Sequence, residues 1–209
     1  MIAASIWSLD PLKILTRREL AAVLAGPAPR SAGARMNRVI FRLACCCGLR
    51  VSEIAALRLA DVCVEGARPH LRVRPEGAKG HKARRVPLWW DAGTLADLAA
   101  WKEERRRQRA APHDPFICCL KPGGFGQPLR RHSLRRRFLT ACKALGLERL
   151  RTLTIHHGRH TFVSHALAGG RSLAEVKSAA GHASLLTTSA YLHVAVDDEG
   201  QPGSLFRYA

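Results

Sequence analysis

The sequence predicts a mainly helical fold with a small antiparallel β-sheet, an α+β class, from three observations. Apolar residues recur at helical spacing over most of the chain and make up 47% of its 209 residues. Two capping boxes, Thr16–Glu19 and Ser172–Glu175, mark helix starts. Between residues 62 and 88 the apolar period shortens to that of strands, with turn residues between the runs.

The predicted elements follow in chain order. A helix begins after Thr16 and stops before Gly26, and a second one ends at Gly48, because glycine is a frequent helix terminator. Residues 116–120 are expected to form a strand or an extended segment. The second helix is expected at residues 34–47. The helices after it are expected at residues 51–57, 91–109, 133–145, 156–168, 173–180 and 185–193. We expect the strands at residues 62–64, 70–73 and 85–88.

The length of the chain fits one folded domain. We expect an N-terminal arm at residues 1–14, the domain at 15–196 and a loose C-terminal tail at 197–209. The N-terminus lacks the basic lead of a signal peptide, and no apolar run reaches the length of a membrane span. Seven cysteines without disulfide spacing predict reduced thiols in a cytoplasmic protein with no membrane partner.

The charge of the chain is strongly positive. Its 34 Lys and Arg against 16 Asp and Glu give a formal net charge of +18 at pH 7. Such a charge repels itself and favours an acidic partner, which is nucleic acid, an anionic membrane surface or an acidic protein. Nucleic acid is the preferred interpretation, because a folded basic domain is typical of phosphate binding.

The first two candidate site groups are an arginine and a lysine near turns. Arg50 follows a helix-ending glycine, and Glu53 one turn later can hold its guanidinium rigid for phosphate oxygens; the alternative is a surface ion pair of little energy. Lys79 lies on the turn between two strands and can reach a site as a mobile charge or proton donor, or be a solvated turn residue. The other basic residues assigned to phosphate-backbone contacts are Lys82, Arg84, Arg85, Arg130, Arg131, Arg135 and Arg136.

Two further groups lie in the C-terminal third. His156, Arg159 and His160 share one helix face by their spacing, which suits an anionic phosphate. The alternative is a metal site on the two histidines, which Arg159 disfavours by charge repulsion. His182 follows a glycine, and Tyr191 comes nine residues later; a lone tyrosine is usually a core or rim residue.

Taken together and in this order, these residues resemble the tyrosine recombinase (phage integrase) family over nearly the whole chain, from about residue 15 to 193. The matching boxes are G-L-R-x-S-E at 48–53, K-G-x-K-x-R-x-V-P-L around residue 79, H-x-x-R at 156–159, G-H at 181–182, and the nucleophile position, Tyr191. The resemblance implies the fold of the family's catalytic domain and a homo-oligomer, a tetramer, on double-stranded DNA with a specific target site. It implies no metal and no other cofactor.

The resemblance also implies a mechanism. Tyr191 attacks a DNA phosphate and forms a 3′-phosphotyrosyl link, with Arg50 and Arg159 clamping the phosphate oxygens. Lys79 protonates the leaving 5′-oxygen, and His156 assists proton transfer from Tyr191. The remaining roles fall to His182, a hydrogen-bond donor to the phosphate, and Glu53, a supporting residue.

Two departures from the family pattern bear on function. Few residues precede the expected domain, so the chain resembles the short, single-domain members such as the fimbrial-type invertases, or a truncated integrase. Gly158 stands where the family usually has leucine, and we expect it to remove a core contact and loosen its helix. The alternative functions are a DNA-binding or regulatory protein with little strand exchange, a nicking–closing activity like that of type IB topoisomerases, and a metalloenzyme around His156 and His160.

Overall fold

The structure of the protein is a computed structural model that describes residues 11–25, 29–77 and 83–191. Lys79 and Lys82, residues 1–10 of the predicted arm and the predicted tail lie outside these residues. The described helices are α1 (Arg17–Leu24), α2 (Ala32–Cys45), α3 (Val51–Ala56), α4 (Ala92–Arg107), α5 (Arg131–Ala141), α6 (Gly146–Thr152), α7 (Ile155–Ala168), α8 (Leu173–Ala180) and α9 (Leu185–Ser189). Short 3-10 turns are η1 (Pro11–Lys13), η2 (Leu59–Asp61), η3 (Pro75–Gly77) and η4 (Cys142–Leu145).

The small sheet has the antiparallel order β1-β2-β3, which confirms the predicted α+β class. Its strands are β1 (Val62–Cys63), β2 (His70–Val73) and β3 (Arg84–Pro87). Leu71 at the centre pairs with Val62 on one side and Val86 on the other, and all three side chains are buried. In β3 the period of two turns Val86 toward the core, while its neighbour Arg85 is exposed.

Both predicted capping boxes are present. The side chains of Thr16 and Ser172 accept the backbone N–H groups of Glu19 and Glu175, and each glutamate accepts the N–H of its cap residue in return. Residues 116–120 form no regular strand; Cys118 makes one isolated bridge to Pro128. Helix α6 was not predicted, because its seven residues carry no stop or start signal beyond Gly146.

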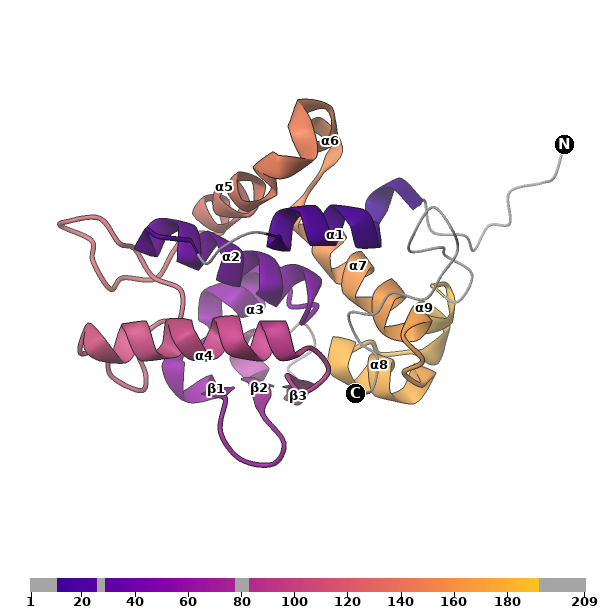
Figure 1. The fold of residues 1–209 in the computed structure, drawn as a ribbon. Helices are drawn as coiled ribbons and strands as arrows, with labels where there is room; N and C mark the ends of the chain where they lie inside the picture. The colour runs from indigo at the N-terminus through magenta and orange to yellow at the C-terminus, as the bar shows by residue number, and fades with distance from the viewer. Residues whose placement is uncertain (1–10, 26–28, 78–82, 192–209) are drawn as a thin grey trace, which may run out of the picture.

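Helix α2 lies at the centre of the fold and packs against α4, α5 and α7 (Figure 1). The main core cluster surrounds it, with Met36, Ile40 and Leu43 fully buried. A second cluster lies between α7 and α8, where Phe162, Val163 and Val176 pack together with Trp90 and Tyr191. In Figure 1 these C-terminal helices form the right side of the molecule. Tyr191 belongs to this second cluster, which is the smaller of the two.

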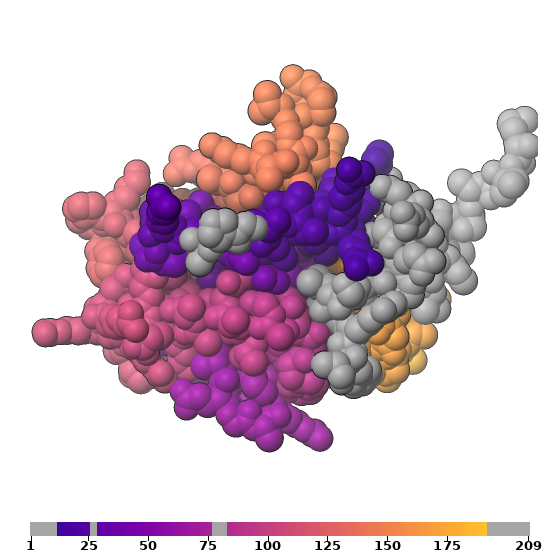
Figure 2. All heavy atoms as spheres, viewed as in Figure 1, coloured from indigo at the N-terminus to yellow at the C-terminus, as the bar shows by residue number. Residues whose placement is uncertain are grey.

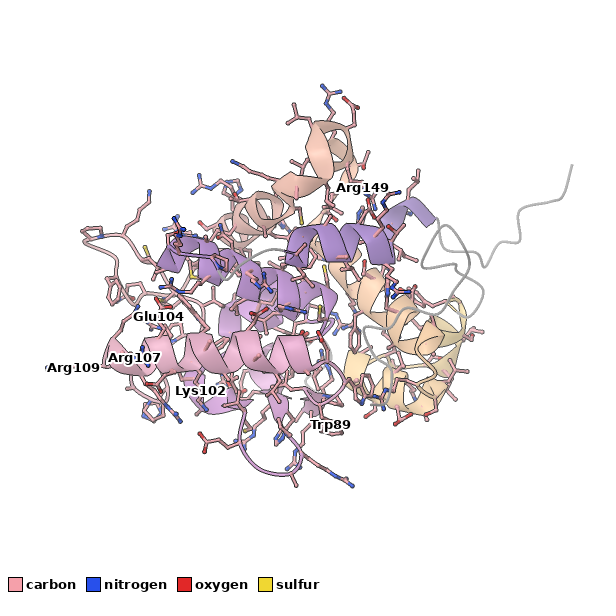
Figure 3. All side chains as sticks on the ribbon, in the orientation of Figure 1. Trp89, Lys102, Glu104, Arg107, Arg109 and Arg149 are labelled. Carbon is pink, nitrogen blue, oxygen red and sulfur yellow. The ribbon has the colours of Figure 1, made fainter. Side chains whose placement is uncertain are left out.

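Arg149 on α6 fastens the start of the described chain to the domain. Its guanidinium donates to Glu19 on α1 at 2.7 Å and to the carbonyl oxygens of Leu12 and Ile14 at 2.7 and 2.9 Å. Figure 3 shows Arg149 between α6 and α1, and Figure 2 shows α5 and α6 projecting at the top of the molecule. The end of the predicted arm therefore packs on the domain, and Ile14 is buried.

None of the helices in the described residues combines the length and the apolar character needed to span a bilayer.

Gly158 does not loosen the packing of α7, as we had expected from the sequence. It is buried where α7 crosses α2, and a Cβ atom there would lie 2.8 Å from Ala44 Cβ and 2.9 Å from the Ala44 carbonyl carbon. Two helix backbones approach this closely only when one residue at the crossing lacks a side chain. The glycine therefore permits a close crossing, and the expectation of a lost core contact was wrong.

We expect Gly158→Ala to lower the free energy of unfolding by about 2 kcal/mol, although alanine is the better helix former. The added methyl group meets backbone atoms of Ala44, which cannot rotate away. Urea unfolding followed by circular dichroism measures the change. Gly33→Ala is the matched control, because its Cβ atom would meet nothing within 4 Å; a stabilised Gly158→Ala protein would contradict the close crossing.

Candidate active site

The turn before α3 brings Arg50 toward α7. Gly48 has φ +63°, and a Cβ atom on it would lie 2.4 Å from the ring of Phe162, so both the conformation and the space demand glycine. The carbonyl oxygen of Gly48 accepts a hydrogen bond from Arg159 Nη1 at 2.9 Å. Arg50 starts α3 two residues later, and its charge acts on Arg159. The two arginines of the predicted phosphate clamp therefore lie in one place.

The buried carboxylate of Glu53 accepts hydrogen bonds from two arginines. Its Oε2 accepts the backbone N–H of Arg50 at 2.8 Å, and its Oε1 accepts Arg50 Nη1 at 3.1 Å. Arg84 on β3 donates to both carboxylate oxygens at 2.8 Å. Burial alone would raise the pKa of Glu53, but the hydrogen bonds and charge of Arg84, together with Arg50, hold that pKa below its ordinary value. Glu53 is thus an ionised brace for Arg50.

Arg84 differs from its prediction as a phosphate contact. Its side chain is 8% exposed, and besides Glu53 it donates to the carbonyl oxygen of Ala179 on α8 at 2.8 Å. A Cβ atom on Gly181 would lie 2.8 Å from Arg84 Cδ, so the glycine lets the arginine pass. Arg84 therefore joins β3, α3 and α8 inside the protein, whereas the next residue, Arg85, is exposed.

We expect Arg84→Ala to lower the free energy of unfolding by about 3 kcal/mol, because it leaves the buried Glu53 carboxylate with Arg50 alone. Arg85→Ala, its neighbour on the opposite face, should change that free energy by less than about 0.5 kcal/mol. Urea unfolding of both variants measures the difference. Because the pKa of Glu53 is lowered in the folded protein, the Glu53–Arg84 ion pair stabilises the fold fully at pH values above the ordinary pKa of a carboxyl group. The loss of stability in Arg84→Ala should therefore become smaller as the pH falls through the lowered pKa of Glu53. Equal losses in the two variants would contradict the inward role of Arg84.

Arg159 on α7 carries a charge that the protein leaves partly unsatisfied. Its Nη2 is buried and has no hydrogen-bond partner among the described residues. Burial first, and then the charges of Arg50 and Arg84, lower its pKa to about 10. An unpaired guanidinium donor beside two other arginines suits an anion with several oxygens, such as a phosphate diester.

His182 follows the left-handed cap of α8 at Gly181, which has φ +68°. Its Nδ1 lies 2.9 Å from the hydroxyl oxygen of Thr188. Burial first, and then the charges of Arg159, Arg50 and Arg84, lower its pKa to about 4. A neutral His182 whose Nδ1 accepts from Thr188 carries its proton on Nε2, where it can be donated to a phosphate.

Tyr191 is 7% exposed and lies beside two histidine rings. Its ring stacks on His160 with centroids 5.7 Å apart and on His182 with centroids 6.2 Å apart. Its hydroxyl lies 2.6 Å from His160 Nδ1. Burial raises the pKa of Tyr191, and the charge of Arg159 acts in the opposite direction. The phenol is therefore protonated and hydrogen-bonded at neutral pH.

The structure brings Arg50, Glu53, Arg159, His182 and Tyr191 together, and it places His156 differently. His156 is exposed in the first turn of α7, and its side chain makes no hydrogen bond to another described residue. The predicted DNA-contacting arginines at 130, 131, 135 and 136 are all exposed on α5 or at its cap, and α5 packs against α2, α3 and α7. Contact with DNA stays a prediction for them.

Two residues have partners at the site that the sequence did not assign. His160 was predicted on the same helix face as His156 and Arg159, but not as the partner of the Tyr191 hydroxyl. Arg84 was grouped with the exposed basic turn, although alternation in a strand turns it opposite to Arg85. No group of three or more His, Cys, Asp or Glu side chains in the described residues has the arrangement of a metal site.

Arginine and histidine side chains lie around Tyr191 on a mostly helical domain, and comparison with known proteins identifies the family. The family model described as the phage integrase family matches residues 13–197. The chain belongs to this family.

Similar curated proteins are named tyrosine recombinases. The chain is 30% identical over 185 residues to tyrosine recombinase XerD of Halalkalibacterium halodurans, covering 87% of the chain and 57% of the relative. It is 30% identical over 199 residues to tyrosine recombinase XerC of Chlamydia trachomatis, covering 91% and 59%. The chain therefore spans less than two thirds of the length of the curated relatives that it matches.

Solved structures share the fold. The crystal structure of XerA recombinase has a TM-score of 0.67 at 21% identity, covering 90% of this chain and 62% of that one. The XerH site-specific recombinase, in a post-cleavage complex with a palindromic difH substrate, has a TM-score of 0.65 at 25% identity, covering 88% and 50%. These likenesses confirm the predicted catalytic-domain fold.

Proposed function

We propose that this chain cuts and rejoins double-stranded DNA at a specific target site through a 3′-phosphotyrosyl intermediate on Tyr191. The observation that carries the proposal is the convergence of the buried Tyr191 with two neutral imidazoles and the arginines Arg50 and Arg159, all four of them half-buried. The names of the relatives, tyrosine recombinases, and the DNA-bound XerH complex support it.

The chemistry assigned to the site needs positive charge and proton transfer. The unpaired Nη2 of Arg159 and the guanidinium of Arg50 stabilise the negative charge that builds on the phosphate oxygens. His182 donates a hydrogen bond to the same phosphate, while Glu53 and Arg84 hold Arg50 in place. Lys79 is proposed to protonate the leaving 5′-oxygen. Re-attack by a 5′-hydroxyl reverses the step, so neither ATP nor a metal or other cofactor is required.

DNA binding is proposed to rest on basic side chains outside the catalytic centre. The net charge of +18 supplies the attraction, and the exposed arginines of α5 and Arg85 are available for phosphate contacts. Lys82 completes the predicted set. For ~6 phosphate contacts the logarithm of the affinity falls by roughly 0.9 per contact for each tenfold rise in salt concentration.

The proposed assembly is a homo-oligomer on DNA, a tetramer during strand exchange. A palindromic substrate, as in the XerH complex, presents two equal half-sites and so favours two copies of one chain. We assign the catalytic domain to residues 15–196, with the arm before it and the tail after it. All seven cysteines are free thiols, five of them buried, which fits a protein acting on DNA in the cytoplasm.

The experiment uses a nicked suicide duplex that carries a site selected from a random-sequence library for binding the protein. The protein should form an adduct with the 3′ end of the cut strand that survives denaturant, and unnicked duplexes should yield recombinant strands. DNA binding without any adduct would favour the regulatory alternative. Adducts with relaxation of supercoiled plasmid but no recombinants would favour the nicking–closing alternative.

A further inference from the structure

The hydroxyl of Tyr191 has a defined hydrogen-bond partner in this chain. It lies 2.6 Å from His160 Nδ1, and the two rings stack at an interplanar angle of 26°. His160 is only partly exposed, and burial first, and then the charges of His157, Lys13, Arg159 and His156, lower its pKa to about 4. In the neutral tautomer that carries its proton on Nε2, His160 accepts the phenolic hydrogen at Nδ1. In that tautomer the Tyr191 proton points at His160.

The histidine expected to receive that proton lies elsewhere. His156 is one helical turn before His160 on α7, it is exposed, and it makes no hydrogen bond to Tyr191. His182 stacks on the other side of Tyr191, but its Nδ1 is engaged with Thr188. Of His156, His160 and His182, His160 is the one whose side chain hydrogen-bonds the Tyr191 hydroxyl in the described residues.

We propose that His160 is a catalytic residue, which accepts the proton of the Tyr191 hydroxyl as this oxygen attacks the scissile phosphate. The inference rests on the proposed function and assigns one of its proton transfers. It leaves His156, at the exposed N-terminal turn of α7, as a donor toward the DNA phosphate.

The step balances in atoms and charge. Tyr191 Oη forms a bond to phosphorus, the bond from phosphorus to the 5′-oxygen breaks, and the phenolic proton moves to His160 Nδ1. The leaving 5′-oxygen takes a proton from a separate acid, for which Lys79 is proposed. In the reverse step the imidazolium of His160 returns its proton to the leaving phenolate.

The electrostatics of the site support an acceptor that works only with substrate. Lys13 from η1 and His156, His157 and Arg159 from α7 all oppose a charge on His160, so it stays neutral without DNA. A bound phosphate diester brings a negative charge beside these groups and raises the affinity of His160 for a proton. Proton removal is thereby coupled to the arrival of the phosphate.

The test measures single-turnover adduct formation on the selected suicide duplex. His160→Gln should slow the reaction by about 10² to 10³-fold, without loss of the thermal unfolding midpoint. Added imidazole should accelerate His160→Ala by at least about tenfold, which a merely structural role would not do. His113→Gln, which changes an exposed histidine in the turn after α4, is the control and should stay within about threefold of the wild type.

A second substrate distinguishes the role of His160 as the base from that of Lys79 as the acid. A 5′-bridging phosphorothiolate releases a thiolate, which needs no protonation, so it should restore Lys79→Ala but leave His160→Gln slow. A His160→Gln rate within threefold of the wild type, a faster rate, or rescue by the sulfur would each overturn the inference while the proposed function stood. No adduct with the wild-type protein would refute the proposed function and this inference with it.

Discussion

Replacing Tyr191 with phenylalanine should abolish the covalent protein–DNA adduct. The variant keeps the ring that packs on His160 and His182 and loses only the oxygen that forms the bond to phosphorus. The free energy of unfolding should fall by only about 1 kcal/mol, the value of one hydrogen bond. Denaturing gel electrophoresis of end-labelled suicide duplex measures the adduct, and a filter-binding titration should show unchanged DNA affinity.

Tyr208→Phe is the matched control for this experiment. The chain has two tyrosines, so this substitution leaves Tyr191 as its sole phenol. The Tyr208→Phe protein should form adduct at the wild-type rate. Adduct that persists in Tyr191→Phe would place the nucleophile on another side chain and refute the proposed function.

Arg159→Gln should reduce the rate of adduct formation by about 10³-fold, the value of a main donor to a charged transition state. The same substitution should raise the thermal unfolding midpoint. Its buried Nη2 lacks a partner among the described residues, and burial, followed by the charges of Arg50 and Arg84, lowers its pKa to about 10, below the ordinary value of an arginine. Keeping Arg159 charged thus opposes folding at every pH below about 10, and this penalty fades only as the pH rises above that value.

The amide nitrogen of glutamine ends two bonds short of the Arg159 Nη1 atom that donates to the Gly48 carbonyl oxygen, so the loss of this one bond should offset part of the gain in stability. Orthovanadate, which resembles a phosphate in reaction, should raise the unfolding midpoint of the wild-type protein and have less effect on Arg159→Gln. An Arg159→Gln protein that is less stable than the wild type and still forms adduct at its rate would contradict the view that the unpaired Arg159 Nη2 serves to bind the phosphate.

The sequence predicted what depends on short stretches of chain. The capping boxes at Thr16 and Ser172 formed as expected, because each uses residues three positions apart. The three strands and their antiparallel order followed from the change of period between residues 62 and 88. The family followed from boxes whose residues keep their order and spacing, and the family model confirms it.

What the sequence did not predict depends on contacts between distant residues. The partner of the Tyr191 hydroxyl is 31 positions away on α7 and could have been any of several histidines. Arg84 looked like Arg85 until its carboxylate partner, 31 positions earlier, was in view. The roles of the catalytic and DNA-contacting residues themselves stay predictions until the variants are measured.

The crossing of α2 and α7 limits how this domain can be recombined with its relatives. Gly158 on α7 and Ala44 on α2 set the distance between the two helices. An α7 with glycine at this position therefore fits only an α2 that lies equally close to it. A relative with leucine at the position of Gly158 must hold its helices farther apart. Chimeric enzymes should therefore exchange residues 32–45 and 155–168 as one block, since exchanging either alone brings a clash or a void beside Arg159.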